Sequence, residues 1–392
     1  MTTDSSSDIG RIYLDANATT RPWPEVIETI AHHLRHSYGN PGSRHAEGRQ
    51  ARRVLEESRE TLASLLGAEP REVVFTSGGT EASNMALSGL TSGPPGTIGT
   101  TAGEHPATTE TCATLVQQGW SLHNFEVDSN GLLTAEQFST LPTDDLRLAT
   151  VILAHNETGI VQDLELLSQL CSRHNVPFHV DAVQAVGKIP VNFRKIGASS
   201  LALGAHKFHG PRGIGALLLR DGTRLSPIQF GGHQESGRRP GTEMVALAAG
   251  MARALELCCQ DMGSRTAELQ ALRNQLEAGL QNACDPVVVN GSDAGRLPNT
   301  LNISFPGADG EALLAALDLE GIACSLGSTC ASGSAEPAPV LVAMGRSPEV
   351  YRSAVRFSVH NDLSSADMDE AIARIARIVK RNRQLCAQSS AD

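Results

Sequence analysis

The feature that most constrains the fold is the alternation of short apolar runs with helical patterns between about residues 60 and 220. Such alternation is typical of a mainly parallel β-sheet covered by helices on both faces. A helical pattern follows the first apolar run, and another covers 163–175. The pattern predicts strands at 73–75, 148–154, 176–181, 201–204 and 213–219.

The pattern changes after Thr242. A helical pattern without proline runs from 245 to about 282, and we expect a single helix that joins two domains. Short strands are expected at 287–289, 300–304 and 355–359, with helices at 311–319 and about 365–385. Since 392 residues exceed one typical core, we predict an α/β protein. Its large domain, residues 21–245, has a mainly parallel sheet, and residues 1–20 and 246–392 form a smaller α+β domain.

Composition excludes several classes of protein. The formal net charge of -11 argues against a nucleic-acid partner, because phosphate binding needs a broad excess of lysine and arginine. The uncharged apolar runs are too short to span a bilayer, and the first ten residues lack the basic-then-apolar order of a signal peptide. We expect a cytoplasmic protein with no membrane partner.

Eight scattered cysteines do not suggest a disulfide scaffold, and no CxxC spacing suggests a zinc or iron–sulfur site. We therefore expect no metal. Cys324 is expected at a buried strand end, and Cys330 lies in a different kind of segment. The others are expected to be reduced, and either buried or incidental on helices: Cys112, Cys171, Cys258, Cys259, Cys284 and Cys386.

The first candidate site is the segment 76–82, which reads TSGGTEA after the first predicted strand. Glycines allow a close approach of the backbone to a phosphate, and a helix that begins there directs free N–H groups at the anion. A glycine-rich turn with a threonine N-cap explains the segment equally well.

The second candidate site combines a carboxylate with a lysine. Asp181 ends a predicted strand, and Lys207 follows another within the Gly/His turn GAHKFHGP. A lysine there can form a Schiff base with pyridoxal 5'-phosphate (PLP), while an aspartate pairs with the pyridinium nitrogen. A surface lysine and a helix-capping aspartate fit the same spacing.

Six segments occur in one order: TSGGTEASN, HNETGIVQD, HVDAVQAVGK, GAHKFHGPRGIGAL, GRRPGT and STCASGSAEP. Together they resemble the cysteine desulfurases of iron–sulfur cluster assembly, which are class V aminotransferase relatives with the PLP-dependent transferase fold type I. The resemblance extends from Tyr13-Leu14-Asp15 to Arg356-Phe357-Ser358. It implies PLP as cofactor, L-cysteine as substrate, a homodimer, and a sulfur-acceptor or iron–sulfur scaffold protein as partner.

The resemblance also assigns roles to single residues. It makes Lys207 the Schiff-base lysine, His105 the histidine that stacks on the ring and exchanges protons, and Asp181 the pyridinium partner. The remaining cofactor contacts implied are Gln184 and Asn156 near the ring oxygen, Gly79, Thr80, Gly204 and His206 at the phosphate, and Thr242 at the phosphate of the neighbouring subunit. The substrate contacts implied are Asn40, Asn156 and Arg356, with Arg356 binding the carboxylate.

Cys330 can also be argued from its surroundings, because residues 325–335 are small and polar. That composition predicts an exposed loop, where a thiol suits a nucleophile that receives and passes on cargo; a passive exposed thiol is the alternative. The resemblance implies that cysteine displaces Lys207 from PLP, and that Lys207 then takes a proton from Cα. The Cys330 thiolate attacks the substrate sulfur, which leaves a persulfide on Cys330 and releases alanine.

The chain departs from the family pattern near the site, which affects expectations about substrate detail and acceptor. Gly204 stands where a serine is usual, and four histidines have no assigned role: His45, His155, His174 and His209. The other departures are His155 before Asn156, His233, Ser236, Pro240 and His360-Asn361.

Two alternatives remain beside a cysteine desulfurase. One is another class V PLP enzyme, either a selenocysteine lyase or an aminotransferase, and an aminotransferase has no need of Cys330. The other is a PLP-fold scaffold without catalysis, against which Lys207, Asp181, His105 and Arg356 all speak.

Overall fold

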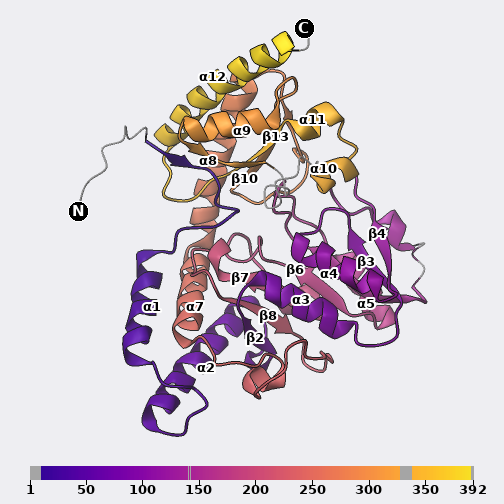
Figure 1. Ribbon diagram of the computed structural model, residues 1–392, viewed down its shortest axis with the longest axis vertical. Helices are drawn as coiled ribbons and strands as arrows, with labels where there is room; N and C mark the ends of the chain where they lie inside the picture. The colour runs from indigo at the N-terminus through magenta and orange to yellow at the C-terminus, as the bar shows by residue number, and fades with distance from the viewer. Residues whose placement is uncertain (1–9, 140, 142, 327–337, 390–392) are drawn as a thin grey trace.

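A computed structural model describes residues 10–139, 141, 143–326 and 338–389. Within these ranges the chain forms a larger block around one sheet and a smaller block around another (Figure 1). Each block has its own large cluster of buried apolar side chains. Cys330 lies outside the described residues.

The larger block is built on a seven-stranded sheet of the described residues, with the order β2-β8-β7-β6-β5-β3-β4. Only β8 runs antiparallel to its neighbours. The carboxyl ends of β2, β3, β5, β6 and β7 therefore meet at one edge, where ligands of open α/β sheets bind. The strands are β2 (Val73–Thr76), β3 (Thr97–Thr101), β4 (Ser121–Phe125), β5 (Leu146–Ile152), β6 (Phe178–Asp181), β7 (Ser200–Gly204) and β8 (Gly215–Leu219).

Helices surround this sheet, and α3 packs against β6, β7 and β8. The helices of the described chain are α1 (Pro24–His36), α2 (Ala46–Leu66), α3 (Gly79–Leu90), α4 (Pro106–Gln117), α5 (Glu165–His174), α6 (Phe193–Ile196), α7 (Val245–Gln260), α8 (Met262–Ala283), α9 (Gly310–Leu319), α10 (Pro339–Ala343), α11 (Pro348–Arg352) and α12 (Ser365–Ser389). None of the helices in the described ranges combines the length and the apolar character needed to cross a membrane.

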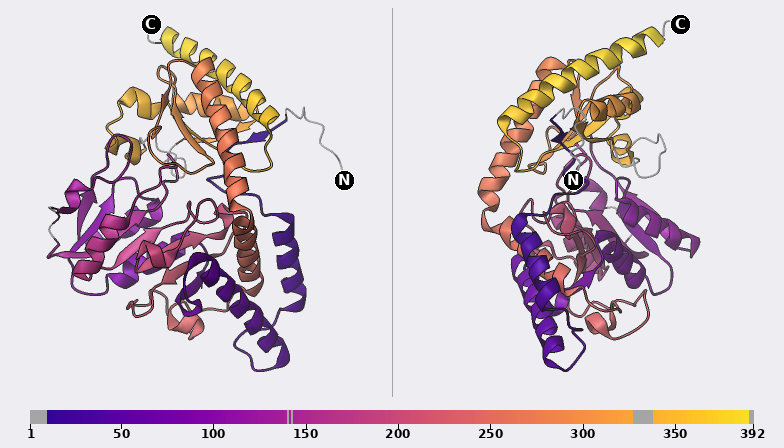
Figure 2. Two further views of the ribbon diagram at one scale, coloured as in Figure 1. Left: turned by 180° about the vertical axis from the view of Figure 1, so that it is seen from behind. Right: turned by 60° about the vertical axis from the view of Figure 1, so that its left-hand side comes forward.

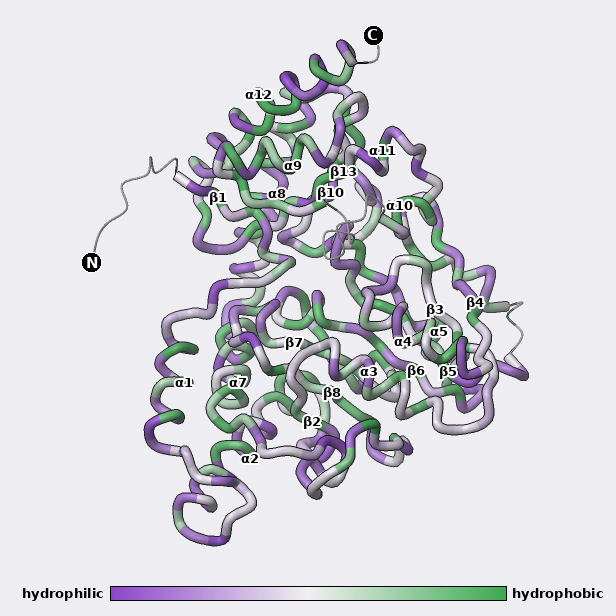
Figure 3. The backbone as a smooth tube through the Cα atoms, viewed as in Figure 1, coloured by the Kyte–Doolittle hydropathy of each residue, from purple (hydrophilic) through white to green (hydrophobic). Residues whose placement is uncertain are grey.

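The smaller block contains an antiparallel sheet with the order β12-β13-β10-β9. The N-terminal segment joins this block, because β1 pairs with β11 and Asp15 forms a bridge with Ser358. Apolar residues recur every three or four positions along α12, which Figure 3 shows as alternating colours. The helix packs against α8 and α9, and its buried side chains belong to the apolar cluster of this block. The strands are β1 (Ile12–Tyr13), β9 (Val288–Val289), β10 (Thr300–Ser304), β11 (Ile322–Ala323), β12 (Ser325–Leu326) and β13 (Ala354–Ser358).

The expectation of one helix over 245–282 is wrong, because the helix breaks at Asp261. Asp261 has the non-helical angles φ -125° and ψ 34°, and aspartate is a poor residue for a helix interior. Figure 2 shows α7 and α8 following one another from the larger block to the smaller one. Since α7 packs with α1 and α2, while α8 packs with α12, we propose that the domain boundary lies near Asp261 rather than at residue 245.

Candidate active site

A cavity of about 430 Å³ opens at the carboxyl edge of the large sheet, where the smaller block meets it. Side chains that follow five different strands point to this place. Nine of the residues predicted from the sequence line it: Gly79, Thr80, His105, Asn156, Asp181, Gln184, His206, Lys207 and Arg356. The structure thus brings together most of the predicted site.

Lys207 ends a short 3-10 helix, Ala205–Lys207, that directly follows β7. Its Nζ donates to the carbonyl oxygen of Asn17 at 2.6 Å and to that of Ala18 at 2.9 Å. Burial, and then the neighbouring Arg356 cation, lower the pKa of Lys207 to about 8. A larger fraction of this amine is therefore neutral, and hence nucleophilic, than for an exposed lysine.

Asp181 and His105 follow β6 and β3. Asp181 Oδ1 accepts from the Val183 N–H at 2.9 Å, and within the described residues no cation forms an ion pair with this buried carboxyl. Burial raises the pKa of Asp181 and lowers the pKa of His105. His105 Nδ1 accepts from the Ala107 N–H at 3.0 Å, so the proton of the neutral ring is on Nε2. A buried carboxyl without a cationic partner, facing the cavity, fits the protonated ring nitrogen of PLP.

The phosphate end of such a cofactor would be held by the start of α3. No side chain caps this helix, so its first N–H groups are available to an anion. Gly79 has to be small, because a Cβ there would lie 2.5 Å from Cγ2 of Val183. His206 Nδ1 lies 3.2 Å from Thr19 Oγ1, and burial and the Lys207 cation lower the pKa of His206 to about 4. The residues present therefore fit a phosphate.

Gly204 does not line the cavity but adjoins it, at the end of β7. Its φ of -133° and ψ of 123° are ordinary extended angles that any residue adopts. A Cβ at Gly204 would lie 3.4 Å from the Gly79 nitrogen and 3.7 Å from Cγ1 of Val183, which is normal contact. The backbone therefore leaves room for a serine.

We expect Gly204→Ser to tighten PLP binding, because the hydroxyl would lie beside the Gly79 N–H at the start of α3. One added hydrogen bond is worth about 0.5–1.5 kcal/mol, or roughly twofold to tenfold in the dissociation constant. Fluorescence titration of the apoenzyme with PLP measures the dissociation constant. Gly204→Ala is the matched control, because it adds the Cβ alone. Weaker binding by the serine variant than by the alanine variant would contradict this expectation.

Arg356 comes from β13 of the small sheet and is nearly buried. Its Nη2 donates to Asp15 Oδ1 at 2.7 Å and its Nη1 to the Asn156 carbonyl at 3.1 Å, while its Nε has no partner among the described residues. Asp15 also accepts from Ser325 Oγ at 2.9 Å. The guanidinium is held in place, and Nη1 and Nη2 each have a second N–H, beyond the bond described, that can donate to a substrate carboxylate.

Asn40 and Thr242 do not reach this cavity in the same chain; both are exposed. The turn that carries Asn40, between α1 and α2, lies at the end of the molecule away from the small sheet (Figure 1). Arg52 joins the two segments, since its Nε donates to the Pro41 carbonyl and its Nη2 to Glu243. The two predicted residues thus belong to one surface, separate from the cavity.

The histidines without a predicted role lie at structural positions, in hydrogen bonds, a ring stack or a helix end. His155, a departure from the family pattern, is buried, with Nε2 2.6 Å from the Gly103 carbonyl and Nδ1 accepting from Glu157 N–H. His45 accepts from Gly48 N–H at the start of α2, and His209 stacks on Trp23 with ring centroids 4.2 Å apart. His174 ends α5.

The departures at 233–240 fall in a turn fixed by Glu235. Glu235 is buried and bonds Arg59 at 2.7 and 2.8 Å, and both it and Ser236 have positive φ. The turn keeps its place through this pair despite the unusual residues.

The cysteines of the described chain are reduced, and its histidines, cysteines and carboxylates form no cluster of three that could hold a metal. Cys112, Cys171, Cys258 and Cys284 are buried, as expected, while Cys259 and Cys386 are half-buried on helices. The expectation for Cys324 is wrong in one respect: it follows β11 but is half-buried rather than buried.

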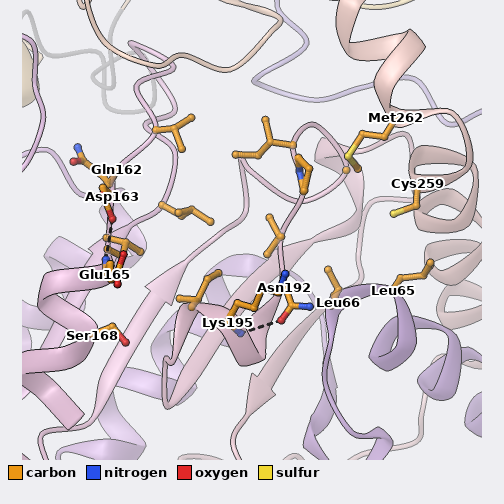
Figure 4. Close-up of a pocket in the computed structure, with 18 of the residues that line it drawn as sticks. Leu65, Leu66, Gln162, Asp163, Glu165, Ser168, Asn192, Lys195, Cys259 and Met262 are labelled. Atoms are coloured by element: carbon orange, nitrogen blue, oxygen red, sulfur yellow. Dashed lines mark hydrogen bonds between the residues drawn. The ribbon is translucent and has the colours of Figure 1, made fainter. Parts of the chain in front are cut away.

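A larger cavity of about 960 Å³ lies elsewhere, between α5 and the segment 187–196 (Figure 4). Figure 4 shows Glu165 and Ser168 on one side of it and Asn192 and Lys195 on the other. None of the predicted site residues lines it.

Sequence reasoning missed residues that complete the site. Asn17, Ala18, Ser325 and Leu326 line the cavity, and Lys188 lies directly behind it. The segment 16–20 (ANATT) directly follows Tyr13-Leu14-Asp15, where the resemblance begins, so its polar residues were a usable signal for Asn17.

The comparisons with known proteins agree with this geometry. Residues 12–370 match the model of the aminotransferase class-V family. The chain belongs to that family. In this class V chain the predicted fold is confirmed, since a solved NifS-like protein superimposes with a TM-score of 0.88 at 34% identity, covering 94% of this chain and 99% of that one.

Curated relatives of this class V protein include the cysteine desulfurase NifS of Azotobacter vinelandii, 41% identical over 95% of this chain and 94% of that protein. The cysteine desulfurase IscS of Dictyoglomus turgidum is 38% identical over 95% of this chain and 96% of that one. A structure described as SspA in complex with cysteine has a TM-score of 0.78 at 30% identity, covering 89% of this chain and 98% of that one.

Proposed function

We propose that this class V protein is a PLP-dependent cysteine desulfurase that releases alanine from L-cysteine and passes the sulfur to an acceptor. The observation that carries the proposal is the meeting of Lys207, Asp181, His105 and Arg356 around one cavity. Relatives named as cysteine desulfurases, about 40% identical over 95% of the chain, support it.

Bound PLP would supply an aromatic ring that accepts electrons from the substrate Cα. The chain would hold it through Lys207, through Asp181 at the ring nitrogen, and through the start of α3 and His206 at the phosphate. Lys207, with its pKa lowered to about 8, is suited to take a proton at neutral pH. The neutral His105 carries its proton on Nε2 and can donate a hydrogen bond from it.

Arg356 is proposed to bind the substrate carboxylate. We expect Arg356→Ala to raise the KM for L-cysteine by roughly ten- to a hundredfold, because a hydrogen bond to a charged group is worth about 1.5–3 kcal/mol. Steady-state kinetics measure the change. Arg377→Ala, which removes an exposed arginine of α12 that does not line the cavity, gives a comparison for general loss of charge. An unchanged KM in Arg356→Ala would mean that the carboxylate binds elsewhere.

Cys330 is proposed as the residue that receives the sulfur as a persulfide. The support comes from the sequence, since this cysteine lies outside the described residues. Ser325 and Leu326, which line the cavity, lead directly into the segment that carries it.

We further propose a cytoplasmic homodimer whose partner is a sulfur-acceptor protein such as an iron–sulfur scaffold. The exposure of Asn40 and Thr242 on one surface supports the dimer, since each would then serve the cavity of the other subunit.

Product analysis of the purified enzyme tests the activity. With L-cysteine and a thiol reductant, alanine and sulfide should appear in equal amounts. A requirement for an amino-group acceptor, with 3-mercaptopyruvate as the product, would indicate an aminotransferase, and turnover of selenocysteine alone would indicate a selenocysteine lyase. Absence of any visible absorbance after PLP loading would indicate a protein without this catalysis.

A further inference from the structure

Lys188 is a buried lysine that lies beside the candidate active site and has no role in the proposed reaction. Only 6% of it is exposed, and its Nζ donates to Asn17 Oδ1 at 2.9 Å and to Gln184 Oε1 at 2.5 Å. It lies in the turn after β6, whereas Asn17 comes from the N-terminal segment. Both of its partners line the cavity.

These bonds fix the orientation of the Gln184 amide. The Asn17 carbonyl can only accept, and Gln184 Nε2 donates to it at 2.9 Å. Lys188 donates to the amide oxygen on the other side. Because the amide oxygen of Gln184 accepts from Lys188 and one N–H of Nε2 donates to Asn17, the second N–H of Nε2 is free. The Gln184 side chain lines the cavity.

Asn17 is the centre of this arrangement and is fully buried. Its carbonyl accepts from both Gln184 and Lys207, and its side-chain oxygen accepts from both Lys188 and Asn299 Nδ2. Its side-chain nitrogen donates to the Asn156 carbonyl and to Thr300 Oγ1. Every polar atom of Asn17 makes a hydrogen bond. Loss of the Lys188 bond therefore changes the hydrogen bonding of the residues around Asn17 that face the cavity.

The charge around Lys188 favours a neutral amine. Its hydrogen-bond partners are amide oxygens, and burial and the cations Lys207 and Arg356 lower its pKa well below the usual value; the Cys258 thiol acts weakly in the opposite direction. A neutral amine has two N–H donors, and the two observed bonds use both.

We propose that Lys188 is a positioning residue: together with Asn17 it orients the Gln184 amide so that its free N–H donates to an oxygen of the bound cofactor. The inference rests on the proposed function, because it needs PLP in the cavity. The inference goes beyond the proposed function because it gives a role to a residue that contacts neither cofactor nor substrate.

The test is a pH titration of the visible absorbance of the PLP-loaded protein, without substrate. In Lys188→Met the midpoint should rise by about one pH unit, because a donor to the cofactor oxygen favours the deprotonated form. Gln184→Leu should give a similar rise, and the double variant should show no further rise. Lys195→Met, which changes an exposed lysine that does not line the cavity, should leave the midpoint unchanged.

The outcomes separate the possibilities. An unchanged midpoint in Lys188→Met, with only a lower Tm, would show a structural role and overturn the inference. Additive shifts in the double variant would show that Lys188 acts by its charge and not through Gln184, which also overturns it. If Lys188→Met does not fold, Lys188→Gln, which keeps an N–H donor, replaces it and should show a smaller rise; no rise would overturn the inference. Lack of a visible band in the unaltered protein would overturn the proposed function itself.

Discussion

Lys207→Ala is expected to abolish turnover of L-cysteine and the attachment of PLP that survives borohydride reduction. No other amine lines the cavity within the described residues, and the loss of a general base alone costs about 10²–10⁴-fold in rate. Mass spectrometry after reduction should find PLP on the peptide that contains Lys207 in the unaltered protein and on no peptide in the variant.

Lys195→Ala serves as the matched control, because that lysine is exposed and does not line the cavity, and the variant should keep both properties. Reduced PLP on Lys188 or Lys195 of the unaltered protein would show that the assignment of Lys207 is wrong. Lys188 is the stricter comparison, since it is buried close to the same site.

Cys330→Ala is expected to eliminate sulfur release while leaving PLP binding and its absorbance intact. The reason is chemical: the substrate sulfur needs a thiolate nucleophile, whereas the groups proposed to hold PLP all lie on other segments. After a pulse of L-cysteine, mass spectrometry should find one additional sulfur atom on Cys330 of the unaltered protein.

Cys324→Ala is the control for this experiment. Cys324 follows β11 and is half-buried, six positions before Cys330, and its loss should leave sulfur transfer in place. Alanine release by Cys330→Ala at the unaltered rate would instead mean elimination without a protein thiol. The protein would then be closer to the lyases that form no persulfide.

Much of the fold could be predicted because its elements are local in the sequence. The strands at 73–76, 178–181, 200–204 and 300–304 were found within two residues, since each is a short segment with apolar or alternating residues between turns. β3 and β4 were missed, because the threonine-rich β3 and the exposed β4 lack such a run. The break at Asp261 was missed because α7 and α8 belong to different cores, which no local pattern shows.

The sequence by itself determined which residues follow the ends of parallel strands. Asp181 and Lys207 each come at the end of a recognisable strand, and the right-handed order of an α/β sheet brings such ends to one edge. His105 follows β3, which was missed, so its place was given only by the resemblance. The resemblance to the family then gave these residues roles, and it also assigned Arg356 to the substrate carboxylate.

Only the tertiary structure decided which partners these residues have. Arg356 bonds Asp15 across 341 positions, and Lys188 bonds Asn17 across 171. Such pairs form because burial leaves a polar group without water, so that it must find whatever partner the packing brings near. The choice of partner depends on how two cores and an N-terminal segment meet, which periodicity and spacing along the chain do not encode.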